Sequence, residues 1–197
     1  MKVVVYGASG RSGSRILQEL TGRGHTAVTP ARHEDDLSNS ATIARTISGA
    51  DAVISAYAPP QDDTDQLIGV TRRQIEAVER AASGIRLLVV GGAGSLEVAP
   101  GVTLTASGHL PAAWLPIAVS HEKALELLRA SNIDWTYLSP AAYFEPGERT
   151  GKFRLGKDNL IANEKGESRI SMEDYAIALV DELEKPAHRR ARFSIGY

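Results

Sequence analysis

The feature that most constrains the fold is a glycine-rich segment, residues 7–13 (Gly-Ala-Ser-Gly-Arg-Ser-Gly), which directly follows the apolar run 3–6. Residues 14–20 then read as helical, so the pattern predicts a buried strand, a tight turn and a helix in succession. In that arrangement the first glycine permits the turn, the second lets backbone approach a phosphate, and the third lets the helix pack on the strand. The helix N-terminus also points free N–H groups and its positive dipole end at an anion. We therefore expect a dinucleotide pyrophosphate site, with an ordinary structural turn as the alternative, made by Gly7, Ser9, Gly10, Arg11, Ser12 and Gly13.

Strand-like and helix-like segments alternate along most of the chain. Strands are expected at 3–6, 25–29, 51–56, 85–90 and 135–138, and helices within 36–49, 63–82 and 119–130. Such β-α-β-α alternation predicts an α/β fold with a doubly wound parallel sheet of the Rossmann type and right-handed crossovers.

The last fifty residues break this rhythm. Residues 145–169 are polar and dotted with glycine, which favours strands and turns. Ser171 and Asp174 have the spacing of a capping box ahead of a helix that Pro186 ends, and 191–197 offers a last strand. We expect a single domain over 1–197, in which the late segment 145–197 contributes a small extension on the substrate side.

The composition excludes several classes of function. The 22 basic and 24 acidic side chains nearly cancel, which argues against nucleic-acid or membrane partners, and zero cysteines exclude disulfides and thiolate chemistry. The five histidines show no ligand spacing, so no metal site is expected, and a Gly-x-Ser-x-Gly elbow is missing. An apolar run of four residues near the start is too short for a signal peptide, and no run reaches the length of a membrane span. The cytoplasm is the expected compartment.

The expected strands end in segments rich in small residues, at 7–13, 30–33, 56–61, 91–95 and 139–144. Ligands of open parallel sheets lie beyond the carboxyl ends of the strands, so these segments should line one cleft. Each segment taken alone fits an ordinary turn better. The cofactor contacts predicted in the middle of this set are Ala56, Tyr57, Gly91 and Gly92.

The end of the second strand distinguishes between cofactors. NAD-binding proteins usually place an acidic residue there to hold the ribose 2′-OH, whereas residues 29–33 contain no acid. Arg32, helped by Arg11, would instead hold a 2′-phosphate, which favours NADP while leaving NAD possible. The alternative is that both arginines are solvated. Asp36 either reaches the adenine amino group or belongs to a solvated acidic turn.

The chain resembles the NmrA-like atypical short-chain dehydrogenases/reductases, and more narrowly the bacterial proteins called NADH-flavin reductases and biliverdin-IXβ/flavin reductase. The resemblance rests on residues 7–13, 52–60, 88–96, 134–141 and 169–176, which span nearly the whole chain. It implies a Rossmann fold, a bound NAD(P) and hydride delivery to a flavin (FMN or FAD) or a related planar acceptor.

One departure from ordinary short-chain dehydrogenases bears on mechanism. None of the six tyrosines has a lysine four residues later, and a lysine role for Lys123 would put Val119 in the tyrosine position. This argues against carbonyl reduction by a Tyr–Lys pair. Flavin or quinone reduction requires instead that donor and acceptor rings be stacked, because the cofactor carries the chemistry and water can supply the proton.

Three polar residues are candidates for assisting. Ser95 would bond the acceptor or the carboxamide, or else cap a turn. His121, on an inward-facing helical stripe, would donate a proton or make a structural hydrogen bond. Lys123 would touch the cofactor or substrate, or else be solvated. Trp114, Tyr143 and Phe144 would wall an aromatic acceptor or pack in the core.

Two classes of function follow. The first is an NAD(P)H-dependent oxidoreductase acting on a flavin or quinone-like small molecule, with reduction of a small specialised metabolite as a weaker variant. The second is a non-catalytic redox sensor that binds NADP(H). The long helix 63–82 either pairs two subunits or only covers the sheet, so both a monomer and a homodimer are consistent with the sequence.

Overall fold

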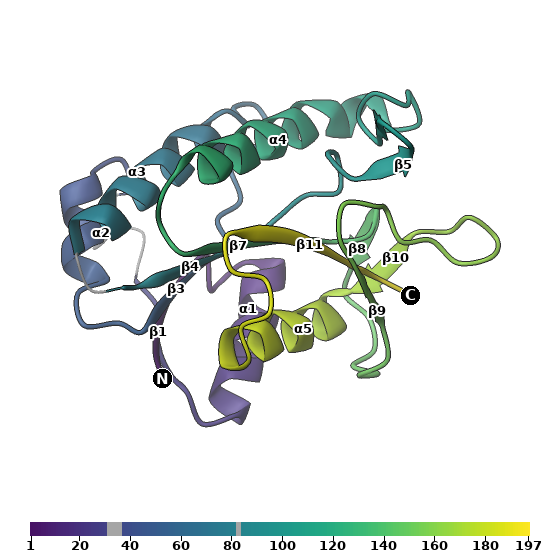
Figure 1. The fold of residues 1–197 in the computed structure, drawn as a ribbon. Helices are drawn as coiled ribbons and strands as arrows, with labels where there is room; N and C mark the ends of the chain where they lie inside the picture. The colour runs from purple at the N-terminus through teal and green to yellow at the C-terminus, as the bar shows by residue number, and fades with distance from the viewer. Residues whose placement is uncertain (31–36, 82–83) are drawn as a thin grey trace.

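The computed structural model describes residues 1–30, 37–81 and 84–197, and within them seven strands form a central sheet (Figure 1). Six neighbouring strands are parallel, and β9 runs antiparallel along the edge of β11. Two short strand pairs lie outside it, β5 Glu97–Ala99 with β6 Val102–Thr103 and β8 Tyr143–Glu145 with β10 Arg169–Ser171. In spatial order the central strands are β2 Thr26–Val28, β1 Lys2–Tyr6, β3 Ala52–Ser55, β4 Arg86–Val90, β7 Trp135–Ser139, β11 Ala191–Gly196 and β9 Arg154–Gly156.

Helices cover both faces of the sheet, which confirms the predicted doubly wound α/β fold. In Figure 1, α1 and α5 lie below the sheet, and α2, α3 and α4 lie above it. A short 3₁₀ turn, η1 Ala112–Trp114, leads into α4. The helices are α1 Arg11–Gly22, α2 Ser40–Thr46, α3 Gln66–Ala81, α4 Leu115–Ala130 and α5 Met172–Glu184.

Strand β1 shows why the sequence adopts this arrangement. Val3 and Val5 pack in the core beneath α1 and α5, while Val4 and Tyr6 pack in the core beneath α2, α3 and α4. Strands buried on both faces carry continuous apolar runs instead of alternating ones. The run 3–6 is therefore the signature of a central parallel strand.

The segment 145–197 does more than extend the domain. Its strand β11 pairs with β7, and its helix α5 packs along α1, so both belong to the central layers. Ser171 caps α5 as predicted, since its Oγ accepts the Asp174 N–H over 3.0 Å. The buried Asp174 carboxylate does not close the capping box: it accepts the N–H groups of Thr150 and Gly151, each over 2.8 Å. The loop around residue 150 is thereby held against the start of α5.

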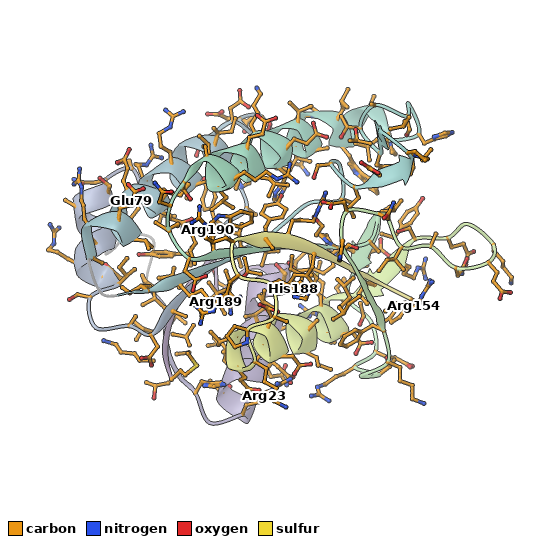
Figure 2. The ribbon with its side chains drawn as sticks, viewed as in Figure 1. Arg23, Glu79, Arg154, His188, Arg189 and Arg190 are labelled. Atoms are coloured by element: carbon orange, nitrogen blue, oxygen red, sulfur yellow. The ribbon has the colours of Figure 1, made fainter. Side chains whose placement is uncertain are left out.

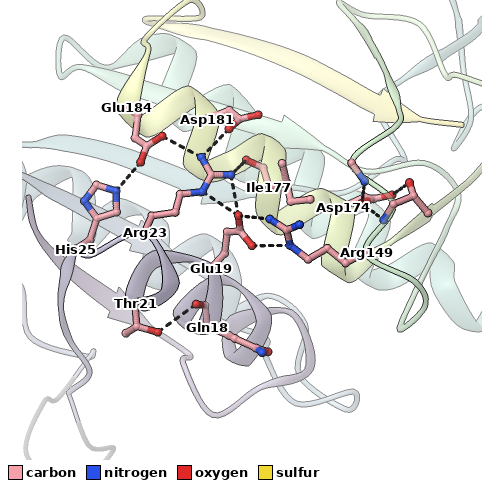
Figure 3. Close-up of polar contacts among 12 residues, drawn as sticks. Gln18, Glu19, Thr21, Arg23, His25, Arg149, Asp174, Ile177, Asp181 and Glu184 are labelled. Atoms are coloured by element: carbon pink, nitrogen blue, oxygen red, sulfur yellow. Dashed lines mark hydrogen bonds and ion pairs between the residues drawn. The ribbon is translucent and has the colours of Figure 1, made fainter.

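A network of ion pairs joins α1 to α5 and to the loop around residue 150 (Figure 3). Glu19 accepts hydrogen bonds from Arg23 and Arg149, and Arg23 also donates to Asp181 and Glu184. A hollow of about 500 Å³ lies among these side chains. Since its charged groups pair with one another, we assign it a structural role.

A second polar cluster lies where β4 and β7 begin. The buried Arg86 and Glu182 form an ion pair there, and His188 Nδ1 lies 2.8 Å from Glu182 Oε2. Figure 2 labels His188 and Arg189 near the start of β11, and Arg154 toward its far end. This cluster therefore stabilises the edge of the sheet opposite to the one at which the strands end.

The path of the chain through the sheet defines a crevice. From β1 the chain passes to β2 on one side and then crosses to β3 on the other. Ligands of open α/β sheets bind at such a switch point, beyond the carboxyl ends of the strands. Among the helices formed by the described residues, none has the length and apolar character needed to span a membrane.

Candidate functional site

A cleft of about 1140 Å³ opens at this switch point, above the ends of β1, β2 and β3. Its walls are the glycine loop at 6–10, the segment 56–60 after β3, and residues 29–30 and 37–38 beyond β2. Helix α3 supplies Gln66, Val70 and Arg73. This volume suits a ligand as large as a dinucleotide, since pockets for drug-sized ligands usually span about 300–1,000 Å³.

The glycines of the loop are required by close backbone contacts. Gly7 has φ +76°, and a Cβ there would lie 2.3 Å from the carbonyl oxygen of Ala56. A Cβ on Gly13 would lie 2.1 Å from the Gly7 carbonyl oxygen. Gly10 is exposed at the cleft. The first glycine thus permits the turn beside β3, the third lets α1 pack on that turn, and the second leaves backbone accessible to a phosphate.

Helix α1 begins immediately beside the cleft. Its N-cap is Gly10, which has no side chain to cap the helix, and its first turn contains no acidic residue. The first N–H groups of a helix have no intrahelical partner, so those of Arg11, Ser12 and Gly13 can meet an anion. The exposed Ser9 precedes them, and Arg11 is also exposed.

The segment after β3 forms the opposite wall. The Ala56 N–H donates to the Tyr6 carbonyl oxygen over 2.9 Å, which holds the segment against the glycine loop. The Tyr57 hydroxyl donates to Gln66 Oε1 on α3 over 3.1 Å. Ala56 and Tyr57, both predicted as cofactor contacts, therefore lie at the cleft with the glycine loop.

Not all the residues predicted to determine the preference between NADP and NAD are among the described ones. Arg32 and Asp36 lie outside the described residues, so the preference for NADP stays a prediction. The cleft contains instead an arginine that we did not predict, Arg73 of α3.

The loop after β4 continues the same edge of the sheet. A Cβ on Gly91 would lie 2.3 Å from the Tyr137 ring, and one on Gly92 would lie 2.9 Å from His121. The Gly92 N–H donates to Tyr137 Oη over 3.0 Å. The 91–92 loop therefore packs directly on the side chains of Tyr137 and His121.

His121 Nδ1 lies 3.0 Å from Tyr137 Oη, and burial lowers the pKa of the imidazole to about 4. Burial also raises the pKa of the Tyr137 hydroxyl. Both groups are consequently uncharged at neutral pH. This disfavours the predicted role of His121 as a proton donor and favours the structural hydrogen bond that was its alternative.

The buried guanidinium of Arg192 holds Ser95 in place. Its Oγ accepts from Arg192 Nη1 over 3.2 Å, while Arg192 Nε donates to Asp158 Oδ1 over 2.9 Å. Because the Ser95 oxygen serves as acceptor in this bond, its own proton can be donated elsewhere. Lys123, the third predicted assistant, is exposed on α4.

Two of the three candidate aromatic walls face solvent. Trp114 and Tyr143 are 44% and 48% exposed, and their rings meet edge to face with centroids 6.2 Å apart. Phe144 packs instead against the buried Tyr175, at a centroid distance of 4.7 Å. Phe144 is therefore partly buried against the core, and the other two rings remain available to a ligand.

Comparison with known proteins decides the family. A model described as NAD(P)H-binding matches residues 7–186. The chain belongs to this NAD(P)H-binding family of atypical short-chain dehydrogenases/reductases. The family implies a nicotinamide dinucleotide, and the glycine cradle of the cleft fits its pyrophosphate.

Relatives match over nearly their whole length. YwnB of Bacillus subtilis, whose function is uncharacterised, is 40% identical over 99% of this chain and 98% of its own. A Burkholderia pseudomallei structure described as a "putative exported protein" is 40% identical, with full coverage of both chains and a TM-score of 0.93. A Bacteroides thetaiotaomicron "putative epimerase" is 43% identical, covering 100% of this chain and 96% of that one, with a TM-score of 0.92. A Streptococcus pneumoniae "putative NADH-flavin reductase" is 36% identical, covering 100% and 99%, with a TM-score of 0.85.

Proposed function

We propose that this NAD(P)H-binding protein is an oxidoreductase that passes a hydride, preferably from NADPH, to a planar acceptor such as a flavin or a quinone. The observation that carries the proposal is the pair Trp114 and Tyr143, two half-exposed aromatic rings in edge-to-face contact. They come from the segments that follow β4 and β7, whose carboxyl ends lie on the same edge of the sheet as the cleft. A flat aromatic acceptor is the kind of ligand that such rings bind.

The chemistry demands little of the protein beyond orientation. The reduced nicotinamide, when bound, supplies the hydride. The glycine loop and the start of α1 hold the pyrophosphate, and the 91–92 loop, fixed by Tyr137, supports the reacting end. The Ser95 hydroxyl, which accepts from Arg192, donates to the acceptor, and water provides the proton that completes the reduction.

The arrangement does not favour carbonyl or epimerase chemistry. Those reactions in related enzymes use a Tyr–Lys pair, in which the lysine lowers the pKa of the tyrosine. Here Val119 stands four residues before the exposed Lys123. The name of the Streptococcus relative agrees with flavin reduction, and that of the Bacteroides relative does not.

The test is oxidation of NADPH and of NADH in the presence of FMN, FAD or a simple quinone, followed by absorbance. We expect turnover with at least one acceptor, a lower kcat for Ser95→Ala, and a higher acceptor KM for Trp114→Leu, with Lys123→Ala as the comparison. Tight NADP(H) binding without oxidation by any acceptor would favour the redox sensor instead. The cytoplasm is the proposed place of action, because it holds the NAD(P)H pool.

A further inference from the structure

Because β1 lies between β2 and β3, the glycine loop that follows it lies between the part of the cleft beyond β2 and the part beyond β3. In this fold the ribose of the adenosine is held at the end of the second strand, so Thr29 and Pro30 mark the adenosine half. Beyond them the lining continues through Leu37 and Ser38 to Val70 and Arg73 of α3. If the ribose is held at the end of β2, the residues of this last group are the ones that would hold the adenine.

The guanidinium of Arg73 is positioned by the surrounding backbone. Its Nε donates to the Leu37 carbonyl oxygen over 2.5 Å. A Cβ on Gly69, one turn earlier, would lie 3.2 Å from both Nη1 and Nη2. The missing side chain at Gly69 therefore leaves room for the guanidinium to lie along α3, and the bond to Leu37 holds it at the cleft.

Several of the described residues that line the cleft together with Arg73 are apolar. Leu37, Val70, Leu17 and Pro30 all line the same cleft, and Val70 is almost fully buried. A phosphate needs several polar partners, whereas a purine ring is suited to apolar side chains together with one planar cation. The lining thus favours the flat base over the 2′-phosphate as the group that meets Arg73.

We propose that Arg73 recognises the adenine of the dinucleotide by packing its guanidinium against the face of the base. The contact is common to NADH and NADPH, so it sets the affinity for both and leaves the choice between them to residues at the end of β2. The inference rests on the dinucleotide of the proposed function and is independent of the acceptor.

Titration of reduced-nicotinamide fluorescence tests this. We expect Arg73→Met to raise the Kd for NADPH and NADH by the same factor, roughly five- to thirtyfold, the range of a partly to fully desolvated cation–π contact. Reduced nicotinamide mononucleotide, which has no adenine, should bind as it does to wild type. Arg72→Met, an exposed neighbour on the same helix, is the control and should change none of the three.

Other outcomes would overturn the assignment. Weakening confined to NADPH would place Arg73 on the 2′-phosphate, and unchanged affinity for both dinucleotides would remove it from the site. Equal weakening of the mononucleotide would mean that Arg73 only supports the fold. If Arg73→Met fails to fold, Arg73→Lys replaces it, because lysine keeps the charge but has no planar guanidinium. The same three Kd values are then compared with those of wild type. Failure of the proposed function is distinct, because it would appear as wild-type protein that binds NADPH and reduces no acceptor.

Discussion

The backbone N–H of Gly92 donates a 3.0 Å hydrogen bond to Oη of Tyr137, a buried side chain on the neighbouring strand β7. The same oxygen lies 3.0 Å from His121 Nδ1 on α4. One hydroxyl thus joins the loop after β4 to a strand and a helix. The position of that loop, which we expect near the nicotinamide, depends on it.

Removal of this hydroxyl should loosen the loop. We expect Tyr137→Phe to lower the free energy of unfolding by about 1–3 kcal/mol, because the Gly92 N–H loses its partner. The Kd for NADPH should rise several-fold as the loop becomes less ordered. Urea unfolding and NADPH titration measure the two effects. Tyr143→Phe removes an exposed hydroxyl and should change stability little; an equal loss in both variants would refute the role of Tyr137.

His121 should make stability depend on pH. Burial lowers the pKa of its imidazole to about 4 in the folded protein, against an ordinary value near 6.5 in the unfolded chain. The unfolded state therefore binds the extra proton first, and stability falls as the pH drops from about 6.5 to about 4, by up to about 3 kcal/mol. His121→Gln should remove this part of the slope between those pH values. If the free energy of unfolding fell equally with pH in wild type and His121→Gln, the assignment would be contradicted.

The third glycine of the loop should tolerate no side chain. Ala at Gly13 would place Cβ against the Gly7 carbonyl, so we expect Gly13→Ala to cost about 1–3 kcal/mol of stability and to abolish measurable dinucleotide binding. Gly22→Ala, at the other end of the same helix, meets nothing within 4 Å and should stay within about 1 kcal/mol of wild type. Thermal unfolding and NADPH titration compare them. Normal binding by Gly13→Ala would mean that the loop does not form the cradle.

The ion pair at the opposite edge of the sheet should affect stability alone. Burial raises the pKa of Glu182, but hydrogen bonds from Arg86 and His188 outweigh it and lower that pKa below its ordinary value. The stabilisation is thus present above pH about 4.5 and is lost as the pH falls through the folded pKa. Glu182→Gln should cost about 3 kcal/mol at pH 7, since it leaves the buried Arg86 with only the more distant Asp134 carboxylate, 3.8 Å from its Nε, as a counter-charge. NADPH affinity should not change.

The surface pair between Arg149 and Glu19 provides the contrast. Arg149 is more than half exposed, so Arg149→Gln should cost less than about 1 kcal/mol. A comparable loss in both variants would show that burial does not distinguish the two ion pairs.

The sequence was sufficient for the parts of the molecule that depend on local chemistry. The glycine spacing at 7–13 requires a turn between a strand and a helix, and the lining of the cleft places that turn at the site. The alternation of apolar segments predicted the sheet and its helices, because each strand buried on both faces has a continuous apolar run. The hairpin of β5 and β6 was not predicted, since strands of two or three residues leave little periodic signal.

The site residues that the sequence did not predict depend on how segments far apart in the chain pair and pack. Arg192 reaches Ser95 because it stands opposite Tyr137 in the pairing of β7 with β11, which no local pattern encodes. Arg73 enters the cleft because α3 lies beside residue 37, far from it in the chain. The roles of Ser95 and Lys123 in catalysis remain predictions, because they depend on a bound acceptor.

Among the described residues, those that line the dinucleotide cleft lie between Tyr6 and Arg73, whereas Trp114 and Tyr143 belong to segments that follow β4 and β7. Substitutions at Trp114 and Tyr143 therefore leave the described lining of that cleft unchanged. A gene of this architecture can therefore diverge toward new acceptors while the residues that line its dinucleotide cleft stay the same.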